Sequence, residues 1–225
     1  NAGVVNVAAA PSFSNPLTDF STDPVHGVWA SDPLWVPPTD GGAVSSWRNG
    51  GSVGGDLVQA TGSKQPTYRA STAAFNNQPT VQFDGTDDVL TPASSIADLA
   101  SWEAVIVGQF LSTATFQSII GGNGPANRVG VFTAAWYVRW GAVVSGSAAD
   151  TDPHLLRVGT ESDAMLVDEV SVLSNTIAIA MADWVIGGQD LTPGFPCKGH
   201  VALCLSVTSD PAAQPGWADF TTWVE

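Results

Sequence analysis

Two acidic segments of this sequence hold side chains that could do chemistry. Asp87 and Asp88 follow an Asp-Gly pair, and Asp150 and Asp152 lie in a segment rich in Gly, Ala and Pro. Carboxylate oxygens are the ligands that Ca²⁺ takes in proteins. The same oxygens also accept hydrogen bonds from backbone N–H groups in turns. We expect turn capping and no cofactor, and keep one calcium ion as the alternative, with Asp87, Asp88, Asp150 and Asp152 as its candidate ligands.

Patterns of catalytic residues are missing from the sequence. Glycoside hydrolysis needs two carboxyl groups that converge at about 5–9.5 Å across a sugar. Asp168 and Glu169 are adjacent, so on one strand they would point to opposite faces. The sequence has no Gly-x-Ser-x-Gly segment and no Cys/His cluster with the spacing of zinc ligands. We therefore expect neither enzyme activity nor a zinc site.

An aromatic segment is the candidate for ligand binding. In an extended strand, Trp136 and Trp140 share one face, while Tyr137 and Arg139 share the other. One of these faces must belong to the core. The other could stack on a sugar ring or contact a neighbouring chain, because aromatic rings are apolar on their faces and polar at their tips. Both assignments stay open, and the candidate ligand-binding residues are Trp136, Tyr137, Arg139 and Trp140.

Short apolar runs separated by turn residues predict an all-β protein. Residues 99–110 are apolar on both faces, which is typical of a central strand covered on both sides. Residues 80–90 are expected to form a hairpin around Asp84-Gly85, and residues 136–144 and 199–207 one strand each. Residues 214–225 are expected to form a short terminal helix, because Trp217, Phe220 and Val224 would share one face.

Charge and cysteine content exclude several classes of function. The formal net charge of −14, with only seven Lys and Arg, excludes a basic surface for nucleic acid and disfavours anionic membranes. No run of about 18 apolar residues occurs, so we expect no membrane insertion. Cys197 and Cys204 would lie roughly 20 Å apart on one strand, too far for a disulfide, so we expect two separate thiols with Cys204 in the core.

Phe83-Asp84-Gly85-Thr86-Asp87-Asp88 resembles the FDG-x-DD motif of LamG-like jelly-roll domains in the concanavalin A-like lectin/glucanase superfamily. The neighbouring segments Asn77-Gln78-Pro79, Trp184-Val185-Ile186-Gly187-Gly188 and Gly199-His200-Val201-Ala202 are similar to segments of the same family. The resemblance spans roughly residues 25–225. Glucanases of the superfamily carry Glu-x-Asp-x-x-Glu on one strand, and this sequence lacks that pattern.

The resemblance implies a jelly-roll β-sandwich of two antiparallel sheets over residues 25–225. Residues 1–24 show no sustained period, so we expect an arm or linker there, with a first β-strand as the alternative. The resemblance also implies a non-catalytic recognition module for cell-surface carbohydrate in a phage virion, as a tail protein, or in a secreted protein. The expected location is therefore the virion or the extracellular space. One alternative is a structural virion domain that binds other subunits through residues 1–24, and a weaker one is a glycan hydrolase.

Overall fold

Antiparallel strands form almost all of the regular structure in the computed structural model, which describes residues 26–96, 102–122, 127–132, 134–140, 142–159, 165–173, 184–188, 195–208, 210, 212, 217 and 220–221. The predicted arm, residues 1–24, lies outside these residues. Of the predicted terminal helix, the described positions are Trp217, Phe220 and Thr221, which are helical. Trp217 and Phe220 share one face, with ring centroids 5.2 Å apart.

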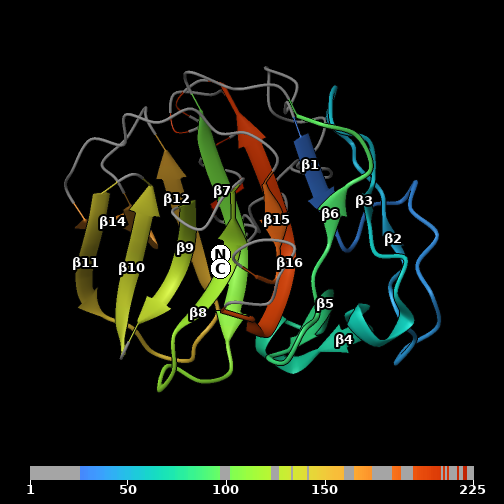
Figure 1. Ribbon diagram of the computed structural model, residues 1–225, viewed down its shortest axis with the longest axis horizontal. Coiled ribbons are helices and arrows are strands. Elements are labelled where there is room, and N and C mark those ends of the chain that lie inside the picture. The colour runs from blue at the N-terminus through green and yellow to red at the C-terminus, as the bar shows by residue number, and fades with distance from the viewer. Residues whose placement is uncertain are drawn as a thin grey trace, which may run out of the picture.

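The strands form three sheets, which we call the large sheet, the second sheet and the small sheet (Figure 1). The large sheet has the order β14 (Val170–Leu173), β13 (Met165–Val167), β12 (His154–Gly159), β7 (Glu103–Phe110), β16 (Lys198–Val207), β5 (Gln78–Asp84) and β4 (Thr67–Thr72), and β1 (His26–Trp29) also pairs with β16. The second sheet has the order β11 (Ala142–Ala148), β10 (Ala135–Trp140), β9 (Asn127–Phe132), β8 (Gln117–Gly121) and β15 (Val185–Ile186). The small sheet has the order β2 (Ser46–Trp47), β3 (Leu57–Val58) and β6 (Thr91–Pro92).

The main core lies between the large and second sheets, as in a β-sandwich. It joins Ile106 and Val201 of the large sheet to Val129 and Val138 of the second sheet. Successive residues of a strand point to opposite faces, so Val107, the neighbour of Ile106, belongs to a separate apolar cluster on the outer face of the large sheet. This confirms the prediction of a central strand that is covered on both sides, and with it the predicted sandwich.

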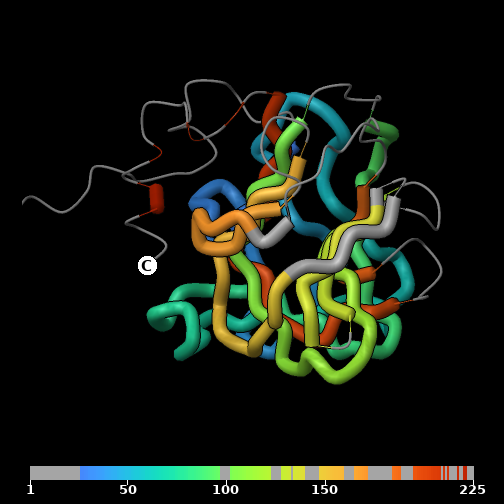
Figure 2. Tube along the Cα trace, turned by 90° about the vertical axis from the view of Figure 1, so that its left-hand side faces the viewer, coloured from blue at the N-terminus to red at the C-terminus, as the bar shows by residue number. Residues whose placement is uncertain are grey.

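The outer cluster is covered in part by segments from outside the sheet. Phe75 reaches it from a short 3₁₀ helix, η2 (Ala73–Phe75), and Trp217 and Phe220 reach it from the end of the chain. A second 3₁₀ helix, η1 (Gly62–Lys64), precedes β4. Figure 2 shows the same strands from the side, with the large and second sheets as two layers. Val107, Leu155 and Leu203 of the outer cluster line a cavity.

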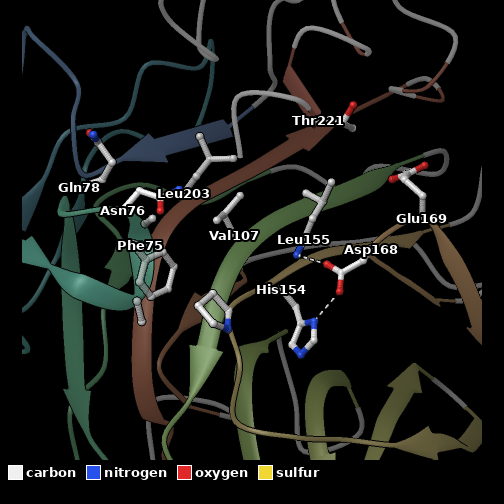
Figure 3. Close-up of a pocket in the computed structure, with 13 residues that line it drawn as sticks. Phe75, Asn76, Gln78, Val107, His154, Leu155, Asp168, Glu169, Leu203 and Thr221 are labelled. Carbon is white, nitrogen blue, oxygen red and sulfur yellow. Dashed lines mark hydrogen bonds and ion pairs between the residues drawn. The ribbon is translucent and has the colours of Figure 1, made fainter. Parts of the chain in front are cut away.

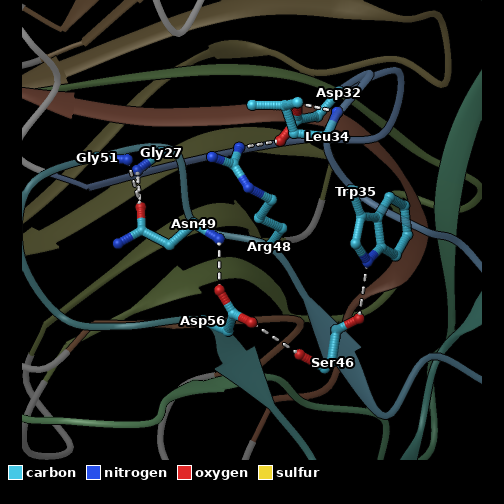
Figure 4. A network of polar contacts seen from close by, with 9 residues as sticks. All are labelled: Gly27, Asp32, Leu34, Trp35, Ser46, Arg48, Asn49, Gly51 and Asp56. Carbon is cyan, nitrogen blue, oxygen red and sulfur yellow. Dashed lines mark hydrogen bonds and ion pairs between the residues drawn. The ribbon is translucent and has the colours of Figure 1, made fainter.

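A polar network holds the first described segments together (Figure 4). Arg48 forms an ion pair with the buried Asp32. The side-chain oxygen of Asn49 accepts a hydrogen bond from the Gly27 N–H at 2.9 Å, and a carboxylate oxygen of Asp56 accepts one from the Asn49 N–H at 3.0 Å. These side chains satisfy backbone groups that short strands leave unpaired, so the network joins β1 to the small sheet.

The acidic turn after β5 does not close the predicted hairpin over residues 80–90. Leu90 instead forms a bridge with Ile186, and Thr91–Pro92 pairs with β3, so the chain leaves the large sheet at Asp84. Val81 and Phe83 pair with β16 on one side of β5, and β4 lies on its other side. Gly85 has a φ of 81°, and an added Cβ would lie 2.6 Å from Lys198 Cβ. Any residue other than glycine at this position would therefore clash with β16. The hairpin prediction was wrong because β5 pairs with β16, which lies more than a hundred positions later in the sequence, and not with the residues that follow the turn.

Carboxylates cap this turn. Asp84 Oδ1 accepts a hydrogen bond from the Thr86 N–H at 2.7 Å, and Asp88 Oδ2 accepts one from the Asp84 N–H at 2.9 Å. We expect Asp84→Ala to lower the free energy of unfolding by about 1–2 kcal/mol, as for the loss of a capping side chain, measured by urea denaturation. The matched control is Asp87→Ala, because no backbone N–H of the described residues donates to its carboxylate. Equal stabilities of the two variants would contradict the capping role of Asp84.

The run predicted as one strand over residues 136–144 is divided between β10, which ends at Trp140, and β11, which begins at Ala142 and pairs with β10 as a hairpin. The run reads as one strand because both strands of the hairpin are apolar. Cys197 and Cys204 are free and buried, as predicted. The described residues include no helix of the length and hydrophobicity needed to span a bilayer.

Candidate functional site

A cavity of about 720 Å³ opens on the outer face of the large sheet (Figure 3). Phe75, Asn76 and Gln78 approach it from one side. Its opposite side carries the polar groups described below. The first side comes from η2 and β5, and the second from the segment β12 to β14. The cavity therefore depends on the order in which the strands pair.

The floor of the cavity is apolar and is built by strand register. Leu155 of β12 and Leu203 of β16 are both direct partners of Val107 in β7, so the three side chains form a row across the sheet. The register of β16 against β7 shifts between Val201 and Leu203, so that Leu203 faces outward. An apolar floor with polar walls is the usual composition of a small-molecule site.

A tight turn supplies two carboxylates to the other side of the cavity. Asp168 and Glu169 connect β13 to β14 and have φ values of 49° and 62°. A two-residue hairpin with both φ values positive is normally formed by Asn-Gly or Asp-Gly, because side chains are unfavourable in this conformation. The Leu155 N–H donates to Asp168 Oδ1 at 2.9 Å and fixes the turn against β12. Glu169 therefore occupies a position where glycine is favoured.

His154 lies between two carboxylates at the edge of the cavity. Its Nδ1 is 2.6 Å from Asp168 Oδ2, and its Nε2 is 2.7 Å from Asp150 Oδ1. Burial alone would lower the pKa of His154, but the hydrogen bonds to Asp150 and Asp168 outweigh burial and raise it. The hydrogen bond from His154 is also the main reason that the pKa of Asp150 is lowered. The arrangement favours a charged imidazolium, which holds the Asp168 carboxylate in place.

Glu169 is positioned by Arg157, which is 3% exposed. Arg157 Nη1 donates to Glu169 Oε2 at 3.0 Å, and its other nitrogens bind Glu103 at 2.8 Å and Asp210 at 2.5 Å. The guanidinium carbon also lies 5.0 Å from the centre of the Trp217 ring. Asp168 and Glu169, the two carboxylates of the cavity, are therefore engaged by His154 and Arg157.

This combination of groups suits a ligand rich in hydroxyl groups. Carboxylates accept hydrogen bonds, and the amides of Asn76 and Gln78 both donate and accept them. The Phe75 ring and the aliphatic floor can cover the C–H face of a ring-shaped ligand. The negative charge of the wall would repel an anionic ligand, so a neutral polyol fits the cavity better than an acidic one.

The predicted ligand-binding residues lie elsewhere, on β10. Trp136 is 3% exposed and packs its ring against His154, with centroids 5.2 Å apart, so it belongs to the core. Tyr137 is 5% exposed and points to the opposite face. Arg139 is partly exposed on that same outer face, and the side chain of Trp140 lies outside the described part of the structure. A role of these four residues in ligand binding stays a prediction.

The predicted calcium ligands divide into two groups. Among the described residues, the acidic cluster with ligand atoms within 4.8 Å of one another consists of Asp84, Asp87 and Asp88. Asp150 does not join it, because Asp150 binds His154 and the N–H of Asp152. The cluster offers hard oxygen atoms of the type that calcium takes, while two of its members also cap the turn. Burial raises the pKa of Asp88 to about 6. Calcium binding at this turn stays a prediction.

Sequence patterns gave little indication of the cavity. Phe75, Asn76 and Gln78 lie in a segment without regular alternation, and they meet Asp168 only through the pairing of β5, β16, β7 and β12. The one available signal was Asp168-Glu169, two acidic residues between short apolar runs. Such a pair indicates a hairpin turn if the flanking runs are taken as separate strands.

Comparisons with known proteins support the fold. No family model matches the chain, and no curated protein matches it either. A sialidase from Trypanosoma rangeli, solved in complex with sialic acid, aligns with 88% of this chain and 32% of its own, with a TM-score of 0.57 and 10% identity. The same sialidase with 2,3-difluoro-KDN aligns with 98% of this chain and 35% of its own, with a TM-score of 0.57 and 11% identity.

A third similar structure is a single domain. Domain 4 of AbnA, a GH43 extracellular arabinanase from Geobacillus stearothermophilus, was solved in complex with arabinotriose. It aligns with 71% of this chain and 81% of its own, with a TM-score of 0.50 and 11% identity. The chain thus spans about a third of the sialidase and most of the arabinanase domain. At these identities, the likeness establishes the β-sandwich fold alone.

The functional expectation from the sequence requires a correction. A non-catalytic recognition module of a phage tail or secreted protein is not what these structures indicate, because those that share the fold are a sialidase and a domain of an arabinanase. Both are glycan-acting enzymes by name. At these identities the likeness carries the β-sandwich fold and not the ligand, and virion subunits as partners have no support. The expectation was wrong because the FDG-x-DD resemblance identifies a fold that serves many different functions.

Proposed function

We propose that this chain is part of a glycan-processing protein and that the cavity on the outer face of the large sheet holds a neutral saccharide. The observation that carries the proposal is the cavity itself. It combines an apolar floor of Val107, Leu155 and Leu203 with a wall of acceptors at Asp168 and Glu169. Glycan-acting proteins among the similar structures support the same class of ligand.

Further expectations belong to this proposal. The LamG-like family within the sandwich fold and an extracellular location are both proposed, and the similar arabinanase is described as extracellular. We also propose that this chain does not cleave glycans by itself. Arg157 binds Glu169 and His154 binds Asp168, so both carboxylates of the cavity are already engaged by other side chains of the chain.

Binding of arabinotriose, measured by isothermal titration calorimetry with the wild-type chain, tests the proposal. We expect Asp168→Asn to weaken binding about tenfold, because a hydrogen bond to a charged group contributes about 1.5–3 kcal/mol. Gln78→Ala should weaken it less, through the loss of one neutral hydrogen bond. The matched control is Asp87→Asn, which removes a carboxylate from the distant acidic turn and should leave affinity unchanged.

A panel of neutral trisaccharides extends the same experiment beyond arabinose. If no neutral saccharide binds, or if Asp168→Asn binds as tightly as the wild type, the cavity is not the site. Release of reducing sugar during incubation with these saccharides would contradict the proposal that the chain does not cleave glycans.

A further inference from the structure

Two arginines lie side by side on the outer face of the second sheet. Arg128 of β9 and Arg139 of β10 are direct cross-strand partners, so their side chains emerge side by side on one face. Only seven Lys and Arg occur in the whole chain. Like charges directly opposite each other in a sheet are destabilising. The pairing of Arg128 with Arg139 therefore concentrates positive charge on this face of the second sheet.

Aromatic rings fix the first of these arginines. The guanidinium carbon of Arg128 lies 4.6 Å from the ring centre of Phe116, 4.5 Å from that of Phe195 and 5.7 Å from that of Tyr137. The residue is only 6% exposed. Cation–π contacts of this kind hold a guanidinium in a fixed orientation and leave its charge intact. Arg128 is thus a preorganised cation beneath the surface.

The second arginine is partly exposed and differs from the paired arginines of the chain. Arg48 and Arg157 both bind carboxylates. Within the described residues, no carboxylate lies within 4.0 Å of the Arg139 guanidinium, and its buried Nε has no hydrogen-bond partner. A buried N–H donor without an acceptor is costly, and the partly exposed guanidinium of Arg139 is where an anion would bind.

An aromatic surface continues from the arginine pair. Phe132 is 44% exposed, and its ring lies 5.0 Å from Phe116 and 6.0 Å from Tyr137. We name Arg128, Arg139, Tyr137, Phe116 and Phe132 the arginine face. It offers a fork-shaped donor for a carboxylate and, four residues further along β9, the exposed ring of Phe132, on which a pyranose could stack.

We propose that the arginine face binds the carboxylate of an acidic saccharide, as a second glycan site separate from the cavity. The proposal rests on the proposed glycan function, and it adds the ligand class at this face. The net charge of −14 would repel anions at long range, so binding must depend on the local contacts of Arg139. The exposed ring of Phe132 favours a sugar, which can stack on it, over a simple anion, which would make no favourable contact with the ring.

Isothermal titration calorimetry with trigalacturonate and its neutral counterpart galactotriose tests the proposal in 50 mM NaCl. We expect the wild-type chain to bind trigalacturonate at least tenfold more tightly than galactotriose. Arg139→Gln should remove that difference, and Arg139→Lys should retain only part of it because it keeps the charge without the fork. Arg69→Gln is the matched control, since Arg69 is also partly exposed and bonds to a neutral side chain, Gln82.

The outcomes separate this proposal from the proposed function. Equal affinity of the wild type for the two trisaccharides, or an unchanged affinity of Arg139→Gln for trigalacturonate, would overturn the acidic-saccharide site. In that case, arabinotriose binding that depends on Asp168 would still support the cavity. The wild-type comparison and its weakening in 500 mM NaCl decide the matter even if Arg139→Gln does not fold.

Discussion

Arg157→Met is expected to lower the free energy of unfolding by about 3–5 kcal/mol, because it leaves a buried carboxylate without its cation. Glu103 is 0% exposed, and Arg157 Nε donates to it at 2.8 Å. Glu169 and Asp210 are more exposed and regain water when the guanidinium is removed, so Glu103 accounts for most of the loss. Urea denaturation at pH 7.5 measures the effect.

Two variants check that the loss comes from the buried charge. Arg69→Met removes a partly exposed arginine and should cost less than about 1 kcal/mol, as surface substitutions usually do. Adding Glu103→Gln to Arg157→Met should restore part of the stability, because the unpaired charge is then gone. If the single Arg157→Met variant unfolds at the same urea concentration as the wild type, the ion pair does not have the role described here.

The stability of the protein is expected to fall by about 3 kcal/mol between pH 8 and pH 4 through His26 alone. His26 is fully buried, and burial lowers its pKa to about 4, despite a hydrogen bond from Nε2 to the Gly55 carbonyl at 3.2 Å. In the unfolded chain its pKa is the usual 6.5. As the pH falls below 6.5, the unfolded state takes up a proton that the folded state cannot, so stability is lost until about pH 4.

The measurement compares urea denaturation of the wild type and His26→Gln from pH 8 to pH 5, where roughly 2 kcal/mol of the effect should be present. The difference between the two proteins isolates His26 from the other titrating groups. His154 gives a control of opposite sign, since its pKa is raised and its contribution is lost as the pH rises. Parallel pH profiles of wild type and His26→Gln would show that His26 is not buried as a neutral side chain.

Continuous apolar runs located two strands of the large sheet, but the apolar run at residues 136–144 concealed the turn between β10 and β11. The continuous run at residues 99–110 corresponds to β7, in the interior of the large sheet, and the run at residues 199–207 corresponds to β16. Local sequence could not indicate which strands pair. The segment after Asp84 therefore looked like a hairpin, although β5 pairs with residues 198–201 on one side and with β4 on the other.

The candidate site could not be predicted for the same reason. The cavity joins Phe75 to Asp168, which meet only because β16 and β7 lie between β5 and β12. Capping in the acidic turn was easier to predict, because the Asp84 and Asp88 carboxylates accept hydrogen bonds from backbone N–H groups only two to four residues away. Arg139 was named as a candidate from strand alternation, but its position opposite Arg128 depends on the register of β9 and β10.

The position of β16 in the large sheet has a consequence for the order of folding. Its residues pair with β7 on one side and with β5 and β1 on the other, so His26 meets Ser206 across 180 positions. Until residue 207 has been synthesised, these three strands have open edges and no common partner. Contacts between such distant residues slow folding, and open strand edges favour association with other chains. We therefore expect slow refolding, and aggregation when the segment that forms β16 is removed.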